Sequence, residues 1–193
     1  QAEGILWNDA NAKQLSTSVA GARHGLVGVI WIGTGNVSVG NSTTETSMIG
    51  GGFGRKVFPA NYFSVGKGIR ITLHGQYSSD GTTPDIATMR VKLDNTTILS
   101  GAFSVAPQTG VSSKDWSLNA NLFCIATGGS GSFGGGGMIT YEDFSGNSIA
   151  GAVGLTTATA TTFSTTGTAT VNVTAQYTGA AAGDLTRCIY STI

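Results

Sequence analysis

The sequence has 193 residues, of which 30 are glycine, and its ten basic and ten acidic residues give a formal net charge of zero. That length favours a single domain, and the balanced charge excludes a protein that binds nucleic acid through a cationic face. No apolar run approaches the roughly 18 residues of a membrane-spanning helix, so we expect neither nucleic acid nor a membrane as a partner.

The first part of the chain predicts an N-terminal extension, residues 1–40, ahead of a main domain at residues 41–193. Within the extension, residues 26–32 form a nearly continuous apolar run bounded by Gly25 and Gly33. Such a run indicates a strand that is buried on both faces or at a subunit contact. We therefore expect residues 1–40 to act as a docking arm.

Two clear alternations of apolar and polar side chains follow, in residues 69–77 and in residues 89–94. A strict period of two is typical of half-buried strands in antiparallel sheets. Residues 78–84 between them concentrate serine, aspartate, glycine and proline, which predicts a turn.

The second half of the chain repeats this scheme. Residues 118–126 alternate, the glycine cluster at residues 128–137 predicts a turn, and residues 138–142 run back. Further strands are predicted at residues 171–177 and 185–193. Short strands at this spacing, with glycine-rich turns and no intervening helices, predict an all-β fold: an antiparallel, jelly-roll-like β-sandwich with an N-terminal extension.

The sequence predicts no catalytic, cofactor or metal site. Its two histidines, His24 and His74, have no further ligand at zinc-binding spacing. Glu142 and Asp143 are adjacent, so on a strand they would point to opposite faces and could not flank one glycosidic bond. The glycine clusters lack the lysine and the following helix of a phosphate-binding loop. We therefore expect a protein that is not an enzyme.

Two cysteines, Cys124 and Cys188, lie in strand-like segments. Free cysteine packs as a small hydrophobic residue, which favours two buried, reduced thiols. A single disulfide between them is the alternative that the sequence leaves open.

Large apolar side chains are the candidate contact residues. Three aromatic residues lie within residues 58–63, and tryptophans are spread along the chain. Aromatic residues are common at protein interfaces, although each of them could instead fill the core of the sandwich. The candidate interface residues are Trp7, Val29, Trp31, Phe58, Tyr62 and Phe63.

The central part of the chain resembles a group of bacteriophage virion proteins found among tail-fibre, head-fibre and decoration components. The resemblance covers roughly residues 40–193. It rests on residues 42–47, on the phrase PANYFSVGKGIRI at residues 59–71, on residues 90–99, and on Trp116 with the strand around Cys124. It implies a jelly-roll-like sandwich assembled as a trimer on the exterior of the virion, and it supplies no catalytic residues.

The expected function is therefore that of a non-enzymatic structural protein of a phage virion, as a capsid decoration or a component of a head or tail fibre. It would be assembled in the host cytoplasm, with other virion proteins as partners. The alternative is a receptor- or carbohydrate-binding adhesin domain, for which a host surface glycan is the candidate partner.

Overall fold

The computed structural model describes the chain as strands joined by turns and loops. Its strands, including every paired segment of the main domain, are antiparallel. The predicted all-β antiparallel class is therefore confirmed. The described residues are 7–9, 14–19, 22–25, 29–33, 36–40, 42–54, 56–79, 85–105, 111–142, 151–157, 160–179 and 185–193.

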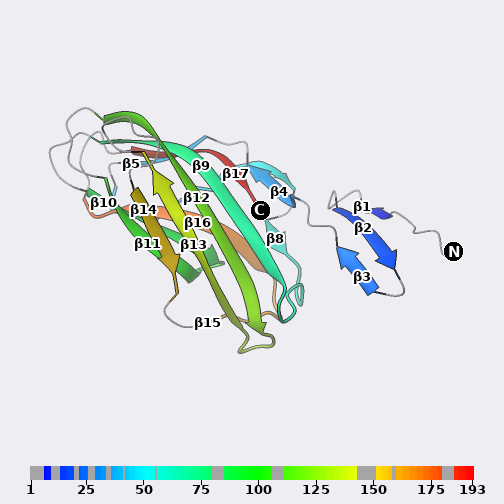
Figure 1. The fold of residues 1–193 in the computed structure, drawn as a ribbon. Helices are drawn as coiled ribbons and strands as arrows, with labels where there is room; N and C mark the ends of the chain where they lie inside the picture. Colours follow the sequence, from blue (N-terminus) through cyan, green and yellow to red (C-terminus); the bar gives the residue numbers. More distant parts are fainter. Residues whose placement is uncertain are drawn as a thin grey trace.

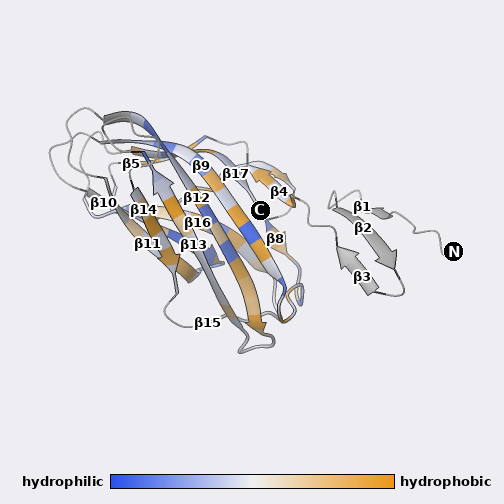
Figure 2. Ribbon diagram, viewed as in Figure 1, coloured by the Kyte–Doolittle hydropathy of each residue, from blue (hydrophilic) through white to orange (hydrophobic). Residues whose placement is uncertain are grey.

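Three long neighbouring strands form the middle of the sheet. They are β9 (Gly68–Ser79), β12 (Val111–Ala126) and β13 (Ser132–Tyr141), with β12 paired to both of the others. The alternation predicted for residues 69–77 is confirmed in β9, where the odd positions are buried and the even ones face outward. Figure 2 shows this alternation as hydrophobic and hydrophilic bands.

The other long strands complete the framework, and they confirm the strands predicted at residues 89–94, 171–177 and 185–193. They are β10 (Asp85–Leu93), β11 (Thr96–Val105), β14 (Gly151–Thr156), β16 (Ala169–Tyr177) and β17 (Leu185–Thr192). The short strands of the main sheet are β4 (Trp31–Gly33), β5 (Val37–Gly40), β6 (Thr46–Ser47), β7 (Gly52–Gly54), β8 (Val57–Phe58) and β15 (Thr161–Thr162).

These strands form one strongly curled sheet. Its hydrogen-bonded path of eleven strands in the described residues runs β6-β16-β10-β11-β14-β13-β12-β9-β17-β4-β7, and β5, β8 and β15 pair beside it. In Figure 1 the strands β9, β12 and β13 lie in front of β10 and β16. The two halves of the sheet enclose a single core because the apolar side chains of both point inward.

The core takes its long aliphatic residues from both halves of the sheet. Leu73 on β9, Leu118 on β12, Met89 on β10 and Val173 on β16 belong to this one core, and all four are fully buried. Burying a side chain of this size stabilises the fold by about 1.5–3 kcal/mol, which is why the alternating pattern fixes the inner face.

The glycine cluster at residues 128–137 corrects one prediction. The turn occupies its start, where the amide of Gly131 donates to the carbonyl of Gly128 over 3.1 Å, but the four glycines from 134 to 137 lie within β13. A Cβ atom at Gly137 would lie 2.4 Å from the carbonyl oxygen of Asn119 on β12. The two backbones approach so closely there that a side chain does not fit, and strand pairing on both edges overrides the turn preference of glycine.

The N-terminal residues include a separate three-stranded sheet of β1 (Trp7–Asp9), β2 (Gln14–Val19) and β3 (Ala22–Gly25). The domain boundary predicted at residue 40 stays a prediction, although β4 and β5 on its N-terminal side pair with β17 in the main sheet. The turn predicted at residues 78–84 lies largely outside the described residues.

Candidate functional site

Two surface features of the described chain stand apart from an ordinary sheet surface: an apolar patch on one sheet edge and a polar hollow on the outer face. The edge patch is defined by Ile32 and Phe53, which are 37% and 70% exposed, together with Val29, which lies three residues before Ile32 in the chain and is 52% exposed. Ile32 on β4 is the direct cross-strand partner of Phe53 on β7. Strand β7 ends the hydrogen-bonded path of the main sheet, and no described strand pairs with its outer edge.

The candidate interface residues separate into three groups in the structure. Trp31, Phe58 and Phe63 are buried in the core, as the alternative reading of these aromatics held. Tyr62 is partly buried and packs against that core, whereas Val29 is exposed. The side chain of Trp7 lies outside the described residues.

The aromatic residues 58–63 belong to a cluster that we call the phenylalanine end of the core. The rings of Phe63 and Phe133 meet edge to face at 4.9 Å, and those of Phe133 and Phe163 do so at 5.7 Å. Phe58 lies 5.2 Å from Phe63 and 4.6 Å from the ring of Tyr62. Edge-to-face geometry is favoured by the ring quadrupoles, so this packing is specific as well as apolar.

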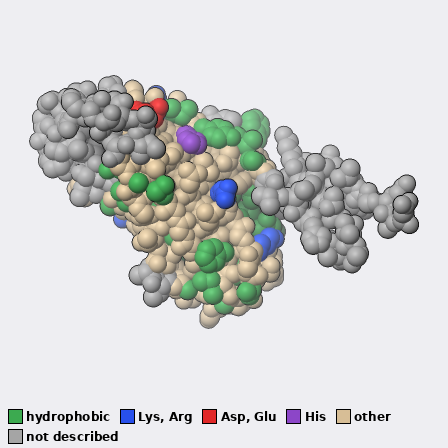
Figure 3. All heavy atoms as spheres, in the orientation of Figure 1, with side chains coloured by type: hydrophobic (Ala, Val, Ile, Leu, Met, Phe, Trp, Pro, Cys, Tyr) green, Lys and Arg blue, Asp and Glu red, His purple; other side chains and the backbone are tan. Residues whose placement is uncertain are grey.

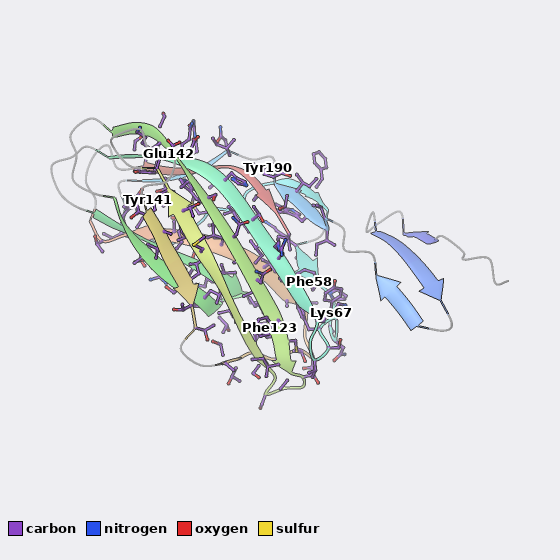
Figure 4. The ribbon with its side chains drawn as sticks, in the orientation of Figure 1. Phe58, Lys67, Phe123, Tyr141, Glu142 and Tyr190 are labelled. Carbon is purple, nitrogen blue, oxygen red and sulfur yellow. The ribbon has the colours of Figure 1, made fainter. Side chains whose placement is uncertain are left out.

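Lys67 lies at the phenylalanine end, where it contacts Tyr62 (Figure 4). Its Nζ lies 3.4 Å from the centroid of the Tyr62 ring and donates to the Tyr62 carbonyl over 3.0 Å. Burial lowers the pKa of Lys67. The cation–π contact and the carbonyl are interactions that compensate its ammonium group for the lost water.

The polar hollow has a volume of about 180 Å³ and lies at the opposite end of the long strands. Three neighbouring strands line it, because Ser117 on β12 is the cross-strand partner of both His74 on β9 and Thr140 on β13. Its walls carry the following residues: His74, Asp115, Trp116, Ser117, Thr140, Tyr141 and Glu142. Figure 4 places Tyr141 and Glu142 at this end of the sheet, far along the strands from Phe123.

Hydrogen bonds hold the walls of the hollow in place. The Glu142 amide donates to the Asp115 carbonyl over 2.9 Å, and the Asp115 amide donates to Oε2 of Glu142 over 3.3 Å. The Tyr77 hydroxyl donates to the Glu142 carbonyl over 2.5 Å. The hydroxyl oxygens of Ser117 and Thr140 lie 2.7 Å apart. The hollow is therefore a preformed feature rather than a gap between loose side chains.

Beneath the hollow lies what we call the tyrosine end of the core, formed by Tyr77, Trp116, Tyr141 and Tyr177. Tyr177 and Thr186 share a short, buried hydrogen bond between their hydroxyls. The ring of Trp116 packs directly over Gly75, where a Cβ atom would lie 2.6 Å from the indole. The Nε1 of Trp116 is the one buried side-chain polar atom of the described residues without a hydrogen-bond partner.

The described ion pairs lie away from both features, on the outer face of β10 and β16. Glu45 accepts hydrogen bonds from Lys92 over 2.9 Å and from Thr174 over 2.5 Å, and Arg90 lies 3.9 Å away. Burial alone would raise the pKa of Glu45, but these hydrogen bonds and cations outweigh it, so its pKa is lowered.

Both cysteines are buried and unpaired, so the expectation of two reduced thiols is confirmed. Burial raises the pKa of Cys124 and raises that of Cys188 to about 11. Cys124 lies at the phenylalanine end, opposite Phe133, and Cys188 lies at the tyrosine end, opposite Gly75.

Comparison with known proteins yields no match to a protein-family model, a curated protein or a solved structure. Among the described residues, no group of three His, Cys, Asp or Glu side chains is placed to hold a metal ion. The same residues include no helix long and apolar enough to cross a membrane. His24 and Asp143, which the sequence analysis considered, have no described side chains.

Sequence reasoning missed Phe53, Asp115 and Tyr190. Phe53 carries a detectable signal, since a lone aromatic among the glycines of residues 50–54 has no neighbouring apolar residue with which to form a core strand. Asp115 and Tyr190 carry no comparable signal, because they become neighbours of His74 only through the pairing of distant strands.

Proposed function

We propose that the protein is a non-enzymatic structural component of the exterior of a phage virion, and that it acts by assembling with copies of itself and with other virion proteins. The observation that carries this proposal is the edge patch. Val29, Ile32 and Phe53 expose apolar surface beside a strand edge with which no described strand pairs. Natural proteins cover or charge such edges, so an uncharged apolar one marks a contact with another chain.

The charge distribution supports self-assembly over docking to a strongly charged partner. The sequence has equal numbers of acidic and basic residues, and the three members of the edge patch are all uncharged. The surface of a second copy can therefore approach this patch without repulsion from charges on the patch. A closed ring of three copies is the arrangement that the resemblance to phage fibre and decoration proteins implies.

The proposal includes a jelly-roll-like architecture for the main domain. Its support is the enclosure of one core by the two halves of a single antiparallel sheet. Domains of this kind tolerate variable loops at their ends and are protected at their edges when subunits cover them.

The direct test is the mass of the full chain in solution, measured by light scattering for the wild type and for Val29→Asp. We expect a trimer for the wild type and a monomer for the variant, because a carboxylate in the patch would have to lose its water at the contact. The matched control is Val65→Asp, at a valine 66% exposed in the turn before β9, which should remain trimeric. A wild-type monomer, or a Val29→Asp variant that keeps the trimer mass, would contradict the proposal.

The virion location is tested separately, by peptide mass spectrometry of density-purified particles from the phage that encodes the chain. The chain should be present in a fixed ratio to the capsid protein. Its absence from intact particles would exclude a virion component, whatever its mass in solution.

A further inference from the structure

We propose that the polar hollow at His74 is a binding site for a neutral saccharide, with room for one sugar ring. This site would give the protein an adhesin activity in addition to assembly. The hollow shares no residue with the edge patch, so the two proposals can fail independently. Its volume of about 180 Å³ is smaller than that of a pocket for a drug-sized ligand, which matches a ligand of a single ring.

The hydrogen-bonding groups of the hollow match the chemistry of sugar hydroxyls. A sugar hydroxyl both donates and accepts, and the hollow offers acceptors in the carboxylates of Asp115 and Glu142. It offers groups that can do either in the imidazole of His74 and the paired hydroxyls of Ser117 and Thr140. Hydrogen bonds to a charged acceptor are the stronger kind, so the two carboxylates would orient the ring.

An aromatic ring stands beside the hollow. Tyr190 on β17 is the cross-strand partner of His74, their ring centroids lie 6.4 Å apart, and the tyrosine is 44% exposed. Sugar rings have an apolar C–H face, and an exposed tyrosine provides a surface on which such a face can pack while its hydroxyl stays in water. Figure 4 shows Tyr190 at the same end of the molecule as Glu142.

The charges of the hollow select a neutral ligand over an acidic one. Asp115 and Glu142 line it, and none of its described lining residues is a lysine or arginine, so a carboxylate or sulfate on the ligand would be repelled. Figure 3 shows that charged side chains are few among the described residues of this face of the molecule. On the adjacent outer face, side chains form hydrogen bonds across β9 and β12, Thr72 with Asn119 and Arg70 with Asn121, each at 3.2 Å.

A metal ion fits these residues less well than a sugar. A cation would use acceptors only, whereas the hollow also presents the hydroxyl donors of Ser117 and Thr140. One of the two carboxylates, that of Glu142, is already engaged by the Asp115 amide.

The test uses the full chain on an array of neutral and sialylated oligosaccharides, followed by calorimetric titration of the best neutral sugar. We expect retention on neutral sugars alone. Tyr190→Ala removes the packing surface and Glu142→Gln removes a charged acceptor, and each should weaken binding about tenfold. The matched control is Phe123→Ala, an exposed aromatic on the outer face at the far end of β12, which should bind like the wild type.

Three results would overturn the proposal. They are no retention on any neutral sugar, retention on sialylated sugars alone, and neutral-sugar affinity unchanged in both Tyr190→Ala and Glu142→Gln. Each variant must first show the cooperative melting of the wild type. If Glu142→Gln fails this check, Ser117→Ala replaces it, because that change removes a wall hydroxyl and leaves the hydrogen bonds to the Glu142 side chain and carbonyl in place. Light scattering of the same samples measures their oligomeric state, so that a loss of sugar binding can be distinguished from a loss of assembly.

Discussion

The two ends of the core are built in different ways, although the same long strands form both. At the phenylalanine end Phe133 packs against Phe63 and Phe163, and these ring contacts involve no hydrogen bond. The tyrosine end contains hydroxyls that bond to one another and to the backbone, such as Tyr177 with Thr186 and Tyr77 with Glu142. Apolar packing provides stability, whereas a hydrogen-bonded core fixes the positions of particular atoms. The hollow lies at the end that fixes positions.

The largest expected effect is at the phenylalanine end. Phe133→Ala should lower the free energy of unfolding by about 3–5 kcal/mol, because it leaves a cavity between the rings of Phe63 and Phe163. Phe123→Ala, at the exposed partner of Gly134, should change it by less than about 0.5 kcal/mol. Denaturant unfolding of both variants measures the difference. Similar losses would mean that the ring cluster is not the stabilising unit of this end.

A smaller effect is expected at the tyrosine end. Tyr177→Phe keeps the ring but removes a buried hydroxyl and leaves Thr186 without that partner, at a cost of about 1–3 kcal/mol. Tyr190→Phe, at an exposed tyrosine on the adjacent surface, should cost almost nothing. If Tyr177→Phe were neutral or stabilising in denaturant unfolding, the hydrogen bonds at this end would not contribute to stability.

A third, weaker effect concerns the surface ion pairs that lie outside both ends. The pKa of Glu45 is lowered in the folded chain, so its contribution is present above the unfolded-state pKa and is lost as the pH falls through the folded-state value. Glu45→Gln should lower the free energy of unfolding by up to about 1 kcal/mol at neutral pH. It should leave this free energy unchanged in acid below the folded-state pKa. Thermal melts of both proteins over this pH range provide the measurement, and a difference that grows toward acid would contradict the assignment.

The reactivity of the two cysteine thiols measures the opening of each end of the core separately. This measurement involves almost no change in the free energy of unfolding. Because burial raises the pKa of both, and that of Cys188 to about 11, neither should react with a thiol reagent at neutral pH until its end of the core opens. Labelling followed by peptide mapping should therefore be slow at both sites and should speed up selectively at Cys124 in Phe133→Ala. Adding reductant should leave the melting temperature unchanged, whereas a drop of several degrees would reveal a disulfide.

The sequence predicted the inner face of the sheet well and the surface sites poorly. The alternation in residues 69–77 identified Ile71 and Leu73 as core residues, because burial on one face demands a period of two. The turn preference of glycine gave the wrong prediction for the glycines of β13, since a strand paired on both edges does not need side chains to stay extended. The sequence could not predict the hollow, because His74, Ser117 and Thr140 become neighbours only through the register of three strands.

The position of β17 has a consequence for how the chain folds. Residues 185–192 lie between β9 and the strands β4 and β5, so the segments at residues 31–40 cannot join the sheet until a segment about 150 residues later in the chain has been made. Pairings this distant in sequence carry a large loop-closure entropy and fold slowly, on the millisecond-to-second scale or beyond. During synthesis β9 therefore has an open edge until β17 appears, and chaperones or rapid assembly would protect the chain most at that stage.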